Sequence, residues 1–147
     1  MSNILNYILG ILGAVIAGIA INRINITLQD KREYRIKEQK KKEIFLEEME
    51  NEIDHAINGN FFRVINNFDK IENKLAEYIN ITEQEKLNEI HNIREAEREE
   101  VSLIKTYPLG LASCDKNLSR AYKNLFHKII KRLKNDRKFS LANTKQS

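Results

Sequence analysis

The chain has 147 residues, of which 31% are charged and 7% are aromatic, with no Trp, one Pro and five Gly. This composition argues against a β-sandwich or barrel and favours long helices with wide solvated faces around one small core. The single cysteine, Cys114, cannot form an intramolecular disulfide, so nothing indicates an oxidising compartment. The fold class expected is all-α.

The first expected element is an apolar helix over residues 1–22. Residues 4–21 carry no charge, and at about 1.5 Å per residue they span roughly 27 Å, close to the hydrocarbon thickness of a bilayer. We therefore predict an N-terminal transmembrane helix. A cleaved signal peptide is the alternative, because Gly18-Ile19-Ala20 offers small residues at a cleavage-like spacing. Against it, residues 1–22 lack the positive charge that signal peptides carry.

Residues 23–44 are predicted to form a basic juxtamembrane stalk. Between Arg23 and Lys42 there are eight basic residues and three acidic ones. Basic residues gather on the cytoplasmic side of a span, so we expect a single-pass protein of the cell inner membrane with its N-terminus outside and its C-terminal domain in the cytoplasm. The same residues suit contact with anionic lipid headgroups, and the lipid bilayer is the first predicted partner.

Small residues recur within the predicted span at Gly10, Ala14 and Gly18. Small residues let two helix backbones approach closely in lipid, where packing drives association. We therefore predict that the chain forms a homo-oligomer through this face.

The cytosolic domain is predicted over residues 45–138, as a bundle of about four helices followed by a disordered tail, 139–147. No Gly or Pro lies between Gly18 and Gly59, so the span is expected to continue as one helix until Asn58-Gly59-Asn60 breaks it. Apolar residues at helical spacing mark the core faces. The first three faces are Phe45, Leu46, Met49, Ile53, Ala56 and Ile57; then Phe61, Val64, Ile65, Phe68, Ile71, Leu75, Tyr78 and Ile79; then Leu87, Ile90, Ile93, Val101 and Ile104.

Helix boundaries follow from capping residues. The pattern Thr82-x-x-Glu85 resembles a capping box and predicts the start of the third helix, which Tyr107-Pro108-Leu109-Gly110 ends. Asp115 is predicted to cap a last helix that runs from Lys116 to about Lys138.

The last helix separates apolar from basic residues. Its apolar face is Leu118, Ala121, Tyr122, Leu125, Phe126, Ile129 and Leu133. Residues 43–114 have a net charge of −9 and residues 115–147 one of +8, and no acid lies on the basic face of this helix. Three readings stay open: a solvated or intramolecularly paired face, a site for an anionic ligand such as RNA or an oligonucleotide, and a membrane-binding surface. The candidate ligand-binding residues are Lys116, Arg120, Lys123, His127, Lys131 and Lys134.

Motifs for catalysis are sparse. The sequence has no HExxH, CxxC, Walker or GxSxG pattern, so we expect no metal, no cofactor and no enzymatic activity. One spacing, Arg120-x6-His127, resembles the arginine and histidine of HEPN ribonucleases, which are small helical domains. The sequence departs from that family at Ala121, where those enzymes usually carry a polar residue. A HEPN-like ribonuclease is kept as an alternative.

Two further resemblances concern the layout of the whole chain. An uncharged span, a basic collar and a helical stalk resemble the b subunit of bacterial ATP synthase, which implies a structural tether or stator-like protein docking a cytoplasmic partner. The same layout, with its length and basic cytosolic surface, resembles the small membrane-anchored ancillary effectors of type III CRISPR systems. That resemblance implies an antiviral membrane effector that senses a cyclic oligoadenylate, with Lys116, Arg120 and Lys123 contacting ligand phosphates.

Overall fold

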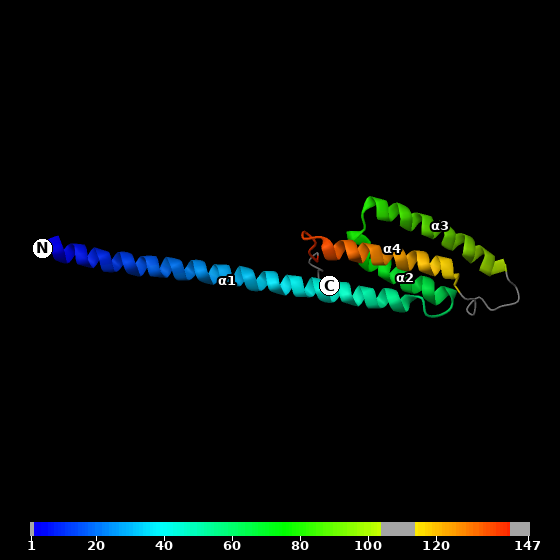
Figure 1. The fold of residues 1–147 in the computed structure, drawn as a ribbon, viewed down its shortest axis with the longest axis horizontal. Helices are drawn as coiled ribbons and strands as arrows, with labels where there is room; N and C mark the ends of the chain where they lie inside the picture. The colour runs from blue at the N-terminus through cyan, green and yellow to red at the C-terminus, as the bar shows by residue number, and fades with distance from the viewer. Residues whose placement is uncertain (1, 104–113, 142–147) are drawn as a thin grey trace. The chain divides into compact units, whose positions relative to one another are not determined.

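The computed structural model describes residues 2–103 and 114–141, and the regular elements within these ranges are helical. They are α1 (Ser2–Ala56), α2 (Phe61–Leu75), a 3-10 turn (Ala76–Tyr78), α3 (Ile81–Leu103) and α4 (Lys116–Asn135), as Figure 1 shows. The predicted all-α class is confirmed for this part of the chain. The chain divides into two units, one formed by Met1–Lys41 with Ser140–Ser147 and the other by Lys42–Phe139, and α1 contributes to both.

The part of α1 in the first unit presents its apolar side chains outward. Within residues 4–21 the large apolar side chains are about half exposed or more, from Ile8 at 49% to Tyr7 at 72%. Among the described helices, α1 is long and apolar enough to cross a membrane, by length and composition. The expectation of one unbroken helix up to the Asn58–Asn60 break is confirmed.

The turn after α1 depends on its glycine. Gly59 has a φ of +134°, a conformation that side chains disfavour, and a Cβ there would lie 2.6 Å from Arg63 Cδ. Asn60 then caps α2, because its Oδ1 accepts a hydrogen bond from the Arg63 N–H at 2.9 Å. The chain thereby reverses direction within a few residues.

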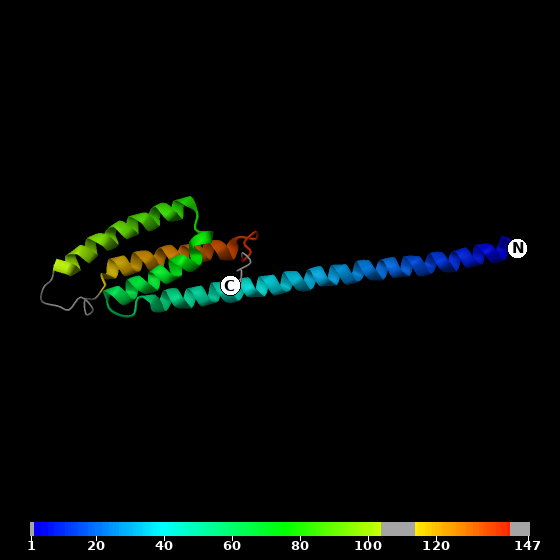
Figure 2. The same ribbon diagram turned by 180° about the vertical axis from the view of Figure 1, so that it is seen from behind.

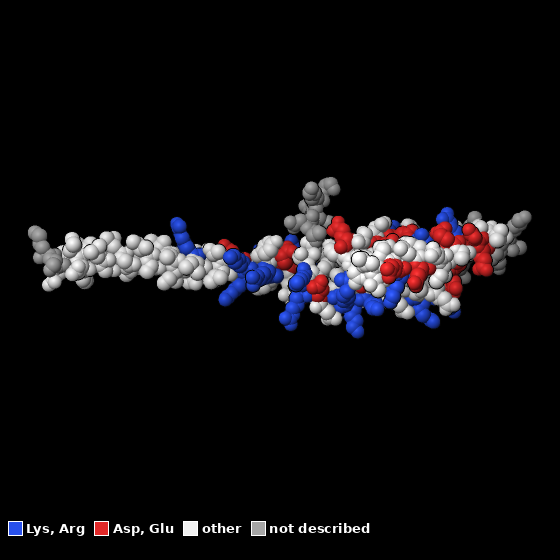
Figure 3. Space-filling model, turned by 90° about the horizontal axis from the view of Figure 1, so that it is seen from above, with Lys and Arg blue, Asp and Glu red and all other residues white. Residues whose placement is uncertain are grey.

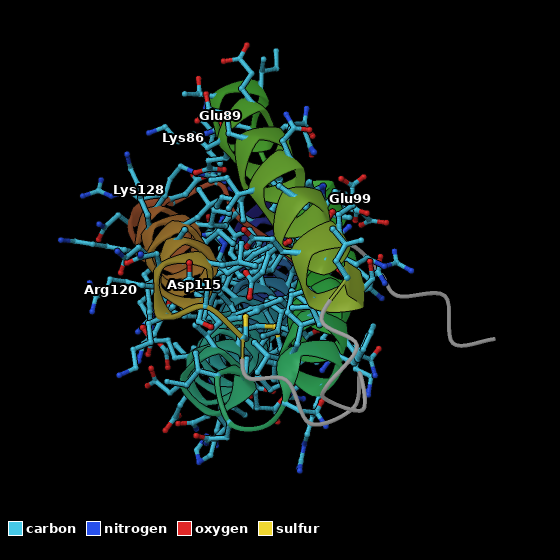
Figure 4. All side chains as sticks on the ribbon, turned by 90° about the vertical axis from the view of Figure 1, so that its right-hand side faces the viewer. Lys86, Glu89, Glu99, Asp115, Arg120 and Lys128 are labelled. Carbon is cyan, nitrogen blue, oxygen red and sulfur yellow. The ribbon has the colours of Figure 1, made fainter. Side chains whose placement is uncertain are left out.

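In the second unit, the end of α1 packs with α2, α3 and α4 as an up-down-up-down four-helix bundle (Figures 1 and 2). The end-on view in Figure 4 places α4 next to α1 on one side and next to α3 on the other. The centre of the bundle is aromatic: the Phe68 ring of α2 stacks on Tyr122 of α4 at 4.7 Å between centroids and lies 6.0 Å from Phe126. The core predicted from apolar spacing is largely confirmed. Ile130, which was not predicted, is also buried, whereas the predicted Ile57 is 40% exposed. The buried apolar residues are Leu46, Met49, Ile53, Ala56, Phe61, Val64, Phe68, Ile71, Leu75, Leu87, Ile90, Leu118, Tyr122, Leu125, Phe126, Ile129, Ile130 and Leu133.

The start of α3 corrects the sequence prediction. The capping box consists of Asn80 and Glu83, two residues before the predicted pair. Asn80 Oδ1 accepts from the Glu83 N–H at 2.9 Å, and Glu83 Oε2 accepts from the Asn80 N–H at 3.0 Å. Asn-x-x-Glu satisfies the same backbone donors as Thr-x-x-Glu. It prevails here because Glu83 also binds Arg132 of α4.

The apolar face predicted for α3 holds only over its first half. Leu87 and Ile90 are buried, whereas Ile93 is 53% exposed and Val101 is only half-buried. Ile104 and the predicted terminator 107–110 lie outside the described residues.

Helix α4 begins as predicted, since Asp115 Oδ1 accepts from the Asn117 N–H at 2.9 Å. It ends at Asn135, three residues before the predicted Lys138. The Asp136 N–H donates to the Leu133 carbonyl at 3.3 Å and closes the helix. Phe139 then turns back onto Tyr78, with ring centroids 5.0 Å apart.

Candidate functional site

Helix α4 carries seven Lys or Arg residues, one His and no acid. Its apolar face is fixed in the core by Tyr122, Phe126 and Ile129, each completely buried. Burial of that face directs the remaining side chains to the outside of the bundle and to the seams with α1 and α3. Figure 3 shows the result, with basic side chains gathered along one long edge of the bundle and acidic ones over much of the rest of that face.

The outward side of α4 forms an exposed row of cations. The row consists of Lys116, Arg120, Lys128 and Lys131. Each of them is exposed, and none makes an ion pair with a residue in the described ranges. Figure 4 shows Arg120 and Lys128 pointing away from the bundle on the same side. The structure thus leaves three predicted ligand residues, and Lys128 as a fourth, open to an external anion.

The other three predicted ligand residues lie on the flank of α4 that faces α1, where they contact acids. Lys123 Nζ lies 2.9 Å and His127 Nε2 lies 3.1 Å from the same oxygen, Oδ1 of Asp54. Lys134 Nζ lies 2.7 Å from Glu50 Oε1. Hydrogen bonds from Lys123 and His127 lower the pKa of the Asp54 carboxyl. The intramolecularly paired face that the sequence left open is therefore present on this flank.

The seam between α4 and α3 holds the most buried charge in the described chain, Glu83, which is 5% exposed. Arg132 donates from Nε to Glu83 Oε1 at 2.7 Å and from Nη2 to Glu83 Oε2 at 2.8 Å. Burial works to raise the pKa of this carboxyl, but the hydrogen bonds from Arg132 and from the Asn80 N–H outweigh it and lower the pKa. Sequence reasoning missed this pair. The signal available to it was the Asn80-x-x-Glu83 capping pattern.

The three histidines do not converge. His55 Nδ1 lies 2.7 Å from the Asn51 carbonyl, His91 Nε2 lies 2.9 Å from Glu72 Oε2, and His127 contacts Asp54. Within residues 2–103 and 114–141, no group of three or more His, Cys, Asp or Glu side chains is arranged to hold a metal ion.

The two residues of the HEPN-like spacing also have different surroundings. The His127 ring bonds to α1, whereas Arg120 points into solvent. Cys114 is half-buried, and burial raises the pKa of its thiol, which makes the thiolate scarce at neutral pH.

A groove of about 230 Å³ lies between α2 and α3, over an apolar floor of Phe61, Phe62 and Ile65. The charges at its rim are compensated internally. Arg94 Nη1 lies 2.7 Å from Asp69 Oδ1, and Arg94 Nε lies 3.4 Å from Glu95 Oε1. An anionic ligand would therefore find little free positive charge there.

The predicted oligomerisation residues lie on the first unit. Gly10, Ala14 and Gly18 are all exposed on α1. A Cβ added at Gly10 or Gly18 would meet no described atom within 4 Å, so the space beside these residues is open.

Fold and site together define a class: an all-α protein in which one helix carries an apolar segment able to span a membrane and then enters a four-helix bundle with a basic edge. No protein-family model, curated protein or solved structure matches the chain.

Proposed function

We propose that the chain is a single-pass membrane effector whose cytoplasmic bundle senses a short oligonucleotide by binding its phosphates. The observation that carries this proposal is the exposed row of α4, Lys116, Arg120, Lys128 and Lys131, on a helix without an acid. Like charges along one helix repel each other, and a polyanion relieves that repulsion by neutralising them together. From Lys116 to Lys131 the row extends about 22 Å along the helix, which suits several phosphates in sequence.

The surroundings of the row favour contact with phosphates over contact with bases. Base recognition by stacking needs an accessible aromatic ring. Tyr122, the aromatic residue nearest the row in sequence, is completely buried, and Phe139 packs against Tyr78 under the Lys42 ammonium. Binding is therefore expected to depend strongly on salt and weakly on base identity. A cyclic oligoadenylate, the ligand implied by the resemblance to CRISPR ancillary effectors, belongs to this chemical class.

The membrane part of the proposal rests on residues 4–21 and on the collar that follows. An exposed apolar helix of this length is stable in a bilayer, where its backbone hydrogen bonds are satisfied internally. The collar between Arg23 and Lys42 orients it with the bundle in the cytoplasm. In this proposal the copies associate through Gly10, Ala14 and Gly18, and ligand binding changes that assembly in the inner membrane as part of antiviral defence.

Orientation is tested with a reporter enzyme that is active only outside the cytoplasm. Fused after Ser147, it is expected to be inactive, because the collar retains the C-terminal domain inside. The same reporter behind a cleavable export signal is the positive control. High activity of the Ser147 fusion would show that the C-terminal domain lies outside the cytoplasm. It would refute both the proposed orientation and the proposal that the ligand is cytoplasmic.

Ligand binding is tested with the full chain in phosphatidylcholine nanodiscs, which offer no anionic lipid to compete. The probes are dye-labelled linear and cyclic hexaadenylate, followed by fluorescence anisotropy over a range of KCl concentrations. We expect log Kd to change with log salt by a slope of about 2 to 3 in magnitude, as three or four phosphate contacts on a single strand give. Arg120→Glu with Lys131→Glu should weaken binding about tenfold or more.

The matched control is Lys70→Glu with Lys86→Glu, which changes the net charge equally at two exposed positions on α2 and α3. Its affinity is expected to stay within about twofold of the wild type, since neither residue belongs to the row. Absence of salt-dependent binding by the wild-type chain would refute the proposed ligand class. An equal loss of affinity in both double variants would show that binding depends on net charge and not on the exposed row.

A further inference from the structure

Asp54 and Glu50 of α1 contact the basic side chains on one flank of α4, next to the exposed row. Lys123 and His127 both point at Asp54 Oδ1, at 2.9 and 3.1 Å, and Lys134 Nζ lies 2.7 Å from Glu50 Oε1. These donors follow each other at positions i, i+4 and i+11 of one helix, so they form a second row along the same face as Arg120 and Lys131. Half of the basic residues predicted to bind the ligand are thus already bound to carboxylates.

These contacts between α1 and α4 can break and re-form readily. The side chains involved are between 34% and 50% exposed, so water and salt reach them, and ion pairs of this kind are weak. A phosphate oxygen accepts the same hydrogen bonds as a carboxylate oxygen. An anion held by the exposed row would lie beside these donors and compete for them.

The seams between α1 and α2 and between α2 and α3 differ in this respect. Between α1 and α2, Lys74 pairs with Glu52; between α2 and α3, Arg94 pairs with Asp69 and His91 contacts Glu72. Lys74 and Arg94 are not part of a row of cations on an acid-free helix. An anion that displaced one of these acids would contact a single basic residue. On α4, an anion that displaced Asp54 and Glu50 would contact a series of basic residues along one helix.

We propose that Glu50 and Asp54 are a built-in competitor of the ligand, masking the second row of α4 until an oligonucleotide with enough phosphates displaces them. This inference rests on the proposed function and sharpens its ligand class. A ligand with two or three phosphates binds to the exposed row alone. A longer ligand also binds to Lys123, His127 and Lys134. Binding of the longer ligand releases two carboxylates of α1, the helix that carries the apolar segment, and so connects occupancy of α4 to that helix.

The test compares a trinucleotide and a hexanucleotide, both dye-labelled oligoadenylates, on the full chain in phosphatidylcholine nanodiscs. In Glu50→Gln with Asp54→Asn, hexanucleotide affinity is expected to rise about three- to tenfold, because the competitor is gone. The trinucleotide should change by about twofold or less. The single variant Asp54→Asn, which keeps the shape of the side chain, should give a smaller gain in the same direction. Far-UV circular dichroism checks that each variant stays helical.

The matched control is Glu47→Gln with Glu48→Gln. These acids lie on the same helix, are exposed and make no ion pair with the described residues, so the pair of substitutions removes the same charge without unmasking α4. Its hexanucleotide affinity should stay within about twofold of the wild type.

The possible outcomes separate the two proposals. The mask is wrong, and the proposed function stands, if the wild type binds the hexanucleotide and Glu50→Gln with Asp54→Asn leaves its affinity unchanged. The same conclusion follows if the control variant raises the affinity as much as Glu50→Gln with Asp54→Asn does. Binding by the unmasked variant alone would support competition by Glu50 and Asp54, but it would refute the proposed function, in which the exposed row of the wild type binds the ligand by itself. If neither the wild type nor the unmasked variant binds either probe, both the mask and the proposed function are wrong.

Discussion

Phe68→Ala is expected to lower the free energy of unfolding of the bundle by about 3–5 kcal/mol, the usual cost of removing a buried aromatic ring from a core. Phe68 is completely buried, stacks on Tyr122 at 4.7 Å and lies 6.0 Å from Phe126. Its ring thus contacts two aromatic rings of α4 from α2. No described neighbour is placed to fill the space, because both facing rings belong to one helix whose position the rest of the core fixes.

The measurement is urea denaturation of the full chain in detergent micelles, followed by near-ultraviolet circular dichroism, which reports the packing of the tyrosines. Phe62→Ala is the control, since Phe62 neighbours Phe61 at the same end of α2 but is 41% exposed. It should cost about 1 kcal/mol or less. Equal losses for Phe62→Ala and Phe68→Ala would contradict the placement of the core.

Apolar periodicity was sufficient to locate this core from the sequence. Phe61, Val64, Phe68, Ile71 and Leu75 recur at helical spacing, and all five are buried on one face of α2. Apolar spacing predicts the buried face of a helix reliably where the helix is amphipathic along its whole length, because the local sequence then determines which face is buried. It was less successful in α3, where Ile93 fits the spacing yet is 53% exposed. Whether an apolar residue is covered depends on what packs beside it, and that is not a local property.

The charged contacts could not be derived in the same way. Asp54 lies 73 residues before His127, and Glu50 lies 84 residues before Lys134. Their meeting depends on the order of the helices around the bundle and on the rotation of α1 and α4 about their axes. Charge segregation between residues 43–114 and 115–147 indicated that acids and bases would meet or that a polyanion would bind. Which cations of α4 are paired and which are open became visible only with the fold.

The second large effect is expected at the α3–α4 seam. Arg132→Met should lower the free energy of unfolding at neutral pH by about 2–3 kcal/mol, because it leaves the Glu83 carboxylate without its partner. The cost is somewhat below that of breaking a fully buried pair, since the Arg132 side chain is about a third exposed. It also removes the donor to the Tyr78 carbonyl at 2.5 Å, which holds the turn between α2 and α3. Lys128→Met, an exposed neighbour of the same charge, should cost about 0.5 kcal/mol or less.

The pH dependence identifies the cause. In the wild type the pKa of Glu83 is lowered from its ordinary value of 4.5, so the pair's contribution is complete above about pH 4.5 and is lost as the pH falls through the folded-state pKa. In Arg132→Met, burial is opposed only by the hydrogen bond from the Asn80 N–H, so the carboxyl takes up a proton at higher pH than in the wild type and the penalty disappears on acidification. The stability gap between the two proteins should therefore be widest near pH 7 and shrink towards pH 3. Glu83→Gln in the Arg132→Met background removes the buried charge altogether, and it should recover part of the loss at pH 7. A gap independent of pH would show that Arg132 acts by packing its aliphatic stem and not by neutralising Glu83.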